Sequence, residues 1–76
     1  MMSNYGDSPE QRRGELDMRF IMEYAPQIAN DYNREWIAVW AFEIIDHDTD
    51  VRALRKRIDY ERYPNPVIRF MDKALV

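Results

Sequence analysis

Trp36 to Ile45 reads WIAVWAFEII, and this stretch decides how the rest of the 76-residue chain has to fold. Nine of its ten residues are apolar, and Glu43 is the exception. Apolar surface in contact with water is unfavourable, so such a run has to be covered on nearly every side. A chain of this length buries only about 60–65% of the surface that its unfolded form exposes. We therefore expect a second copy of the chain or a different protein to cover part of the run.

The run itself is predicted to be a helix. Trp, Ile, Val and Phe favour strands, which makes a strand the main alternative, but Ala38 and Ala41 suit a helix. Both glycines of the chain lie near its start, so no glycine-containing hairpin turn follows the run. No second strand-like segment is evident, and a lone strand would leave its backbone groups unpaired. We predict a helix that covers residues 35–45 and extends back toward Gln27.

Capping signals predict the remaining helices. Residues 8–11, SPEQ, combine a serine cap, a proline at the first helical position and a glutamine that completes a capping box. They predict a helix over residues 9–24. Asp48 or Thr49 can cap another helix, which we predict over residues 50–60, and an Asn-Pro pair predicts a short final helix over residues 66–74.

Composition indicates a globular protein that stays inside the cell. Apolar residues make up 46% of the chain and charged residues 33%, which is typical of folded domains. No apolar run reaches the roughly 20 residues that span a membrane, and the start lacks a hydrophobic signal region. We expect an all-α fold, a single domain of three to four helices over residues 8–76 after a flexible lead over residues 1–7, in the cytoplasm.

The acidic cluster after the apolar run resembles the start of a calcium-binding loop but not its end. Asp46, Asp48 and Asp50 match the first three ligand positions of an EF-hand. The sixth position should be glycine and is Val51, and the twelfth should be a glutamate and is Arg57. We expect these carboxylates to stabilise a helix N-terminus, and we predict no metal ligand.

A catalytic role for His47 finds no support in the sequence. A histidine base needs a nucleophile or a substrate pocket nearby, and the chain has no cysteine. None of its hydroxyl residues lies in a recognisable catalytic motif. We therefore predict no catalytic residue and no cofactor, and we expect a protein that is not an enzyme.

A basic stretch indicates the second class of function, nucleic-acid binding. Arg52, Arg55 and Lys56 share one face of the predicted helix, where they would suit phosphates or an acidic protein surface. The net charge of −3 argues mildly against this class, because nucleic-acid binders usually carry a basic footprint. A nucleic-acid-binding regulator that uses these three residues is the alternative function.

The leading prediction is a protein interface on the apolar run. On a helix, Trp36, Trp40 and Glu43 would share one side, with Tyr32 at its edge. Tryptophan and tyrosine are enriched in interface hot spots, and a carboxylate beside two indoles suits an interface rim. The competing interpretation makes this helix the centre of the bundle, with Glu43 reaching solvent. We expect a small interaction protein that binds another protein or a second copy of itself, such as an inhibitor, an antitoxin or an accessory subunit.

Overall fold

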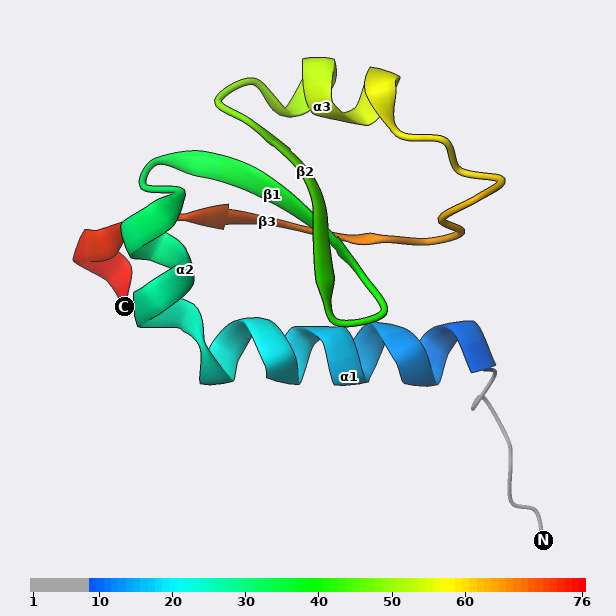
Figure 1. Cartoon of the computed structure of the whole chain (residues 1–76), viewed down its shortest axis with the longest axis horizontal. Coiled ribbons are helices and arrows are strands. Elements are labelled where there is room, and N and C mark those ends of the chain that lie inside the picture. Colours follow the sequence, from blue (N-terminus) through cyan, green and yellow to red (C-terminus); the bar gives the residue numbers. More distant parts are fainter. Residues whose placement is uncertain (1–8) are drawn as a thin grey trace, which may run out of the picture.

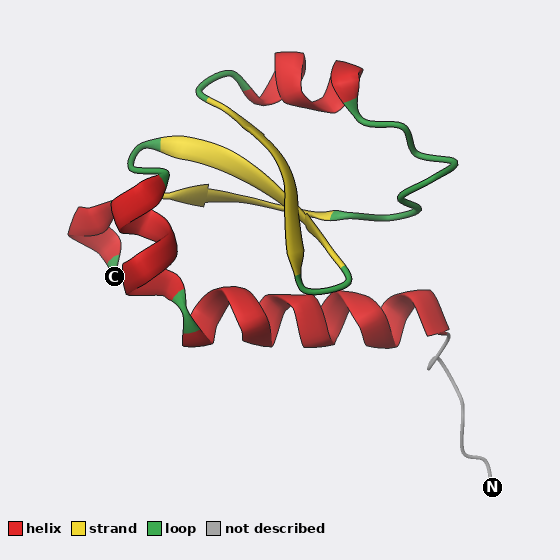
Figure 2. Ribbon diagram, in the orientation of Figure 1, coloured by secondary structure: helices red, strands yellow, loops and turns green. Residues whose placement is uncertain are grey.

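The computed structural model describes residues 9–76 and shows an α/β fold, so the prediction of an all-α helical bundle is wrong (Figures 1 and 2). An antiparallel sheet of three strands lies between a layer formed by α1 and α2 and a short helix, α3. The predicted lead over residues 1–7 and the predicted cap at Ser8 lie outside the described residues. In chain order the elements are α1 (Pro9–Glu23), α2 (Ala25–Asp31), β1 (Glu35–Trp40), β2 (Glu43–Asp48), α3 (Val51–Arg57), β3 (Val67–Met71) and the 3-10 helix η1 (Lys73–Leu75).

The apolar run that was predicted to be a helix begins instead with β1, the central strand of the sheet. Side chains alternate along a strand. Ile37 and Val39 therefore face α1 and α2, whereas Ala38 faces α3. These three residues are completely buried. A continuous apolar run is what a strand covered on both faces requires, and over so few residues its period does not distinguish a strand from a buried helix.

A two-residue hairpin turn without glycine connects β1 to β2. Ala41 and Phe42 adopt φ values of 53° and 63°, and two successive residues with positive φ are typical of the tight type I′ hairpin turn. The backbone amides of both residues donate hydrogen bonds to the carboxyl oxygens of Asp17, at 3.1 and 2.8 Å. Asp17 lies on α1 and is 1% exposed. The argument that a hairpin here needs glycine was wrong because a buried side chain supports the turn.

The segment predicted as the final helix also forms a strand. β3 pairs antiparallel with β1 on the side opposite β2, and Phe70 lies opposite Trp36. Asn65 has a φ of 54°, a conformation that asparagine tolerates in turns. The Asn-Pro pair therefore ends a loop and leads into a strand.

Two of the predicted helices are confirmed in outline. α1 begins at Pro9 and ends one residue before the predicted boundary. α3 is shorter than predicted, and Asp50 caps it by accepting a hydrogen bond from the amide of Arg52 at 2.9 Å. Leu54 and Ile58 bury the inner side of this segment against the sheet.

No helix among residues 9–76 is long and apolar enough to cross a membrane.

Candidate functional site

The two tryptophans of the predicted interface lie half-buried on the α3 face of the sheet. The ring of Trp36 lies 5.3 Å from that of Phe70. Trp40 donates a hydrogen bond from Nε1 to the carbonyl oxygen of Pro64 at 3.1 Å, and the guanidinium of Arg13 lies 4.7 Å from its ring centroid. Trp40 therefore contacts both the loop before β3 and the first turns of α1. These contacts give the Trp40 side chain a structural role.

The other two predicted interface residues, Tyr32 and Glu43, lie apart from each other. Tyr32 follows α2, packs against the core under α1 and α2, and has its ring 4.8 Å from that of His47. Glu43 is exposed at the start of β2, opposite Trp40. Directly opposed residues of paired strands share a face, so the structure places Trp36, Trp40 and Glu43 on the α3 face of the sheet and Tyr32 on the other face.

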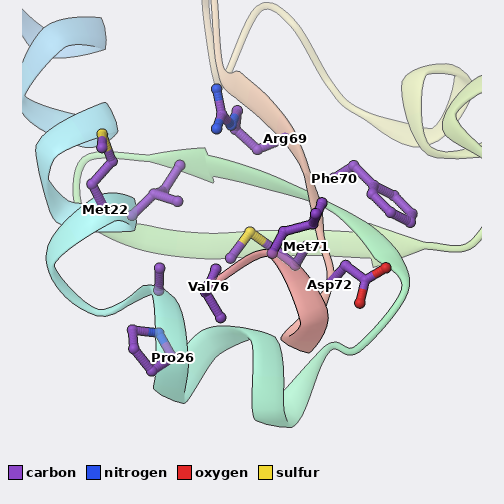
Figure 3. A pocket seen from close by; sticks show the side chains of 10 residues that line it. Met22, Pro26, Arg69, Phe70, Met71, Asp72 and Val76 are labelled. Carbon is purple, nitrogen blue, oxygen red and sulfur yellow. The ribbon is translucent and has the colours of Figure 1, made fainter.

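A groove beside the end of β3 is lined mainly by apolar residues. It has a volume of about 380 Å³ and lies between β3, η1 and the junction of α1 with α2. Figure 3 shows Met22 and Pro26 on the helical side of this groove, across from Met71 and Val76. Its lining residues are Ile21, Met22, Ala25, Pro26, Arg69, Phe70, Met71, Asp72, Leu75 and Val76. We call this feature the β3 groove.

Several apolar side chains of the β3 groove are open to solvent. Leu75 is 74% exposed, Met22 67% and Val76 53%. Single exposed apolar residues are ordinary, but a contiguous group around a depression is typical of a surface that contacts another molecule.

The groove also runs along an open edge of the sheet. Four consecutive residues, 69 to 72, line it. Successive residues of a strand face opposite sides of the sheet, so one groove reaches all of them only along the strand's edge. Among residues 9–76, β3 pairs with β1 alone. An edge strand presents unpaired backbone N–H and C=O groups to solvent.

Two opposite charges border the groove. Arg69 is exposed and makes no ion pair with any residue from 9 to 76. The Asp72 carboxylate accepts a hydrogen bond from the amide of Ala74 at 2.9 Å and so caps η1. The groove therefore combines apolar walls, open backbone groups and a free guanidinium.

In the acidic cluster that resembles the start of a calcium loop, the carboxylates of Asp46 and Asp48 bind the guanidinium of Arg57. Arg57 donates two hydrogen bonds to Asp46 at 3.0 Å, one to Asp48 at 2.6 Å and one to the carbonyl of His47 at 3.0 Å. Hydrogen bonding from Arg57 is the main reason why the pKa values of both carboxyl groups lie below 3.8. Within residues 9–76 there is no group of three histidine, cysteine, aspartate or glutamate side chains placed to hold a metal ion.

The three candidate nucleic-acid contacts, Arg52, Arg55 and Lys56, all lie exposed on α3. None of their side chains pairs with a residue in the described part of the chain. α3 has seven residues and follows a strand, so it is not the second helix of a helix-turn-helix motif.

Sequence reasoning missed the contacts that join residues far apart in the chain. Nδ1 of His47 lies 2.6 Å from a carboxyl oxygen of Glu35, and Tyr32 packs beside it. Once β1 and β2 are paired, Glu35 and His47 are diagonal neighbours. Only the correct strand pairing could have revealed this cluster.

Comparisons of the chain with models of protein families, with curated proteins and with solved structures find no match.

Proposed function

We propose that this protein is a small non-enzymatic interaction protein of the cytoplasm, and that it binds an extended segment of a partner protein in the β3 groove. The observation that carries the proposal is that exposed apolar side chains and an open strand edge occur in the same groove. The proposed interface therefore centres on Met22, Leu75 and Val76 rather than on Trp36 and Trp40.

An extended segment suits this groove better than a helix does. A strand added to an edge gains affinity from main-chain hydrogen bonds and specificity from pockets that accept alternate side chains. The edge of β3 supplies the backbone groups, and Met22, Pro26 and Leu75 supply apolar walls beside it. A segment with alternating apolar residues would fill both.

The charges favour a segment that carries a carboxylate. Arg69 is the free cation at the groove, and a guanidinium pairs with a carboxylate through two parallel hydrogen bonds. We expect bound segments to be apolar, extended and acidic at one position.

A peptide-display selection tests the proposal. A library of extended peptides is selected on the full chain, and the peptides are measured by calorimetry against Met22→Glu and Leu75→Glu. Both side chains are more than half exposed, so these variants keep the fold. Tyr60→Glu is the matched control, because Tyr60 is 46% exposed and does not line the groove.

Each outcome decides for or against the proposal. Selected peptides should lose at least about tenfold in affinity with Met22→Glu and Leu75→Glu, since a buried unpaired charge costs more than 1.4 kcal/mol. The Tyr60→Glu variant should bind them as the wild type does. Peptides that bind all three variants equally contradict the proposed surface. Concentration-dependent dimers that Leu75→Glu dissociates would replace the partner protein with a second copy.

Nucleic-acid binding remains a second candidate because three cations of α3 are exposed and unpaired. Arg57, in contrast, is fully engaged with two aspartates. The candidate predicts binding to a duplex that weakens steeply as salt is raised. Unchanged binding after Arg52, Arg55 and Lys56 are neutralised together would exclude it.

A further inference from the structure

A second depression lies on the opposite side of the junction between α1 and α2, toward β2. Its volume is about 440 Å³. It is separate from the β3 groove, since the two have no lining residue in common. The residues that line it are Phe20, Tyr24, Gln27, Ile28, Asp31, Tyr32 and Ile44.

Aromatic rings form much of its wall. The rings of Phe20 and Tyr24 lie 5.3 Å apart and are inclined by 54°, and both line the depression. Tyr32 lines the same depression, and its other neighbour is the ring of His47. The face of an aromatic ring is electronegative and attracts cations whose centre lies within about 6 Å of it.

The depression carries a single, negative charge. Asp31 is the only charged residue of its lining. The Asp31 carboxylate is exposed and pairs with no cation among residues 9–76. The depression thus offers three aromatic walls and one free negative charge.

This combination fits one class of cation better than the others. A primary ammonium and a guanidinium bind mainly through hydrogen bonds, for which Asp31 is the single carboxylate of the lining, so they would leave the three rings unused. A quaternary ammonium needs no hydrogen bonds, because methyl groups cover its charge, and aromatic surfaces are its usual protein environment. We propose that the depression formed by Phe20, Tyr24, Tyr32 and Asp31 binds a trimethylammonium group.

Choline and its uncharged carbon analogue, 3,3-dimethylbutan-1-ol, test this proposal with the full chain. The two molecules share shape and differ in charge, so their comparison isolates the attraction of the rings and of Asp31 for a cation. NMR titration should give saturable shifts at residues of the depression for choline, and at least about fivefold weaker binding of the analogue. N-acetyl-trimethyllysine amide serves as the second probe, and its affinity relative to choline distinguishes a methylated side chain from a free small molecule.

Two variants with matched controls locate the site. Tyr24→Leu should weaken choline binding about two- to fivefold, the usual size of an exposed cation–π contact. Tyr60→Leu is the control, because Tyr60 and Tyr24 are 46% and 47% exposed and only Tyr24 lines the depression. Asp31→Asn should weaken binding to a similar extent, and less at high salt, whereas Glu23→Gln should not.

Three results would overturn the proposal. They are shifts that do not saturate, equal binding of choline and the uncharged analogue, and equal losses in the Tyr24→Leu and Tyr60→Leu variants.

Discussion

A carboxyl oxygen of Asp17 lies 2.8 Å from the backbone nitrogen of Phe42, and this hydrogen bond joins α1 to the tip of the hairpin between β1 and β2. The second carboxyl oxygen accepts the amide of Ala41 at 3.1 Å. One buried side chain therefore satisfies both central amides of a turn whose residues adopt unfavourable positive φ values.

Asp17→Asn should destabilise the protein by about 1–3 kcal/mol. An asparagine keeps one acceptor oxygen but directs its NH₂ group at the second amide, which leaves a donor unsatisfied. Urea denaturation followed by tryptophan fluorescence measures the change. Glu15→Gln on the exposed side of α1 is the control and should change stability by less than about 0.5 kcal/mol. Equal effects of the two substitutions would show that Asp17 does not support the turn.

Ala41→Gly should stabilise the protein by roughly 0.5–1 kcal/mol. Relief of positive φ gains about 1–2 kcal/mol for a residue other than glycine, and the greater freedom of glycine in the unfolded chain returns about 0.4–1 kcal/mol of this. Ala53→Gly in α3 should instead destabilise by about 1 kcal/mol. A loss of stability in Ala41→Gly would contradict the turn geometry.

Gly14→Ala should raise stability by about 1 kcal/mol. Gly14 lies within α1, and a Cβ atom added there meets nothing within 4 Å. Alanine is the better helix former by about this amount. The midpoint of thermal unfolding should rise, and a fall would mean that the start of α1 packs more closely than the structure shows.

Arg57→Gln should destabilise the protein at neutral pH and destabilise it less in strong acid. The hydrogen bonds from Arg57 lower the pKa values of Asp46 and Asp48. A lowered pKa contributes stability that is complete above the ordinary value of 3.8 and is lost as the pH falls through the folded-state values. Denaturation of wild type and variant should therefore differ less in the acid range than near neutral pH.

Carbon-detected NMR titration checks the same prediction directly. The pKa values of Asp46 and Asp48 should rise toward 3.8 in Arg57→Gln. Arg55→Gln is the control, because the Arg55 side chain is exposed and pairs with no residue between 9 and 76. Unshifted carboxyl titrations in Arg57→Gln would mean that the guanidinium does not bind the two aspartates in solution.

Local signals predicted the parts of the fold that depend on local interactions. Pro9 begins α1 as predicted, because start signals of a helix act over a few residues. The cap of α3 is Asp50 rather than the predicted Asp48 or Thr49. The hairpin depends on a contact between Asp17 and Ala41, which are 24 positions apart. The sequence held one indication that Asp17 is buried. Asp17 and Ile21 are one helical turn apart and share the buried side of α1.

The candidate site could not be predicted because it joins segments that only the folded chain brings together. Met22 and Leu75 belong to different ends of the sequence and meet in one groove. They lie beside the edge strand β3, and the sequence segment of β3 was predicted as a helix. The wrong secondary structure at residues 67–71 therefore hid the groove that we propose as the interface.

Amide hydrogen exchange along β3 tests the proposed function most directly. The exchange rates of Arg69, Phe70 and Met71 are measured in the free protein and with a saturating selected peptide. We predict that the amides on the open edge exchange rapidly in the free protein and become protected on binding, whereas those of β2 do not change. Protection confined to β2 or α3, with β3 unchanged, would contradict strand addition at the β3 groove.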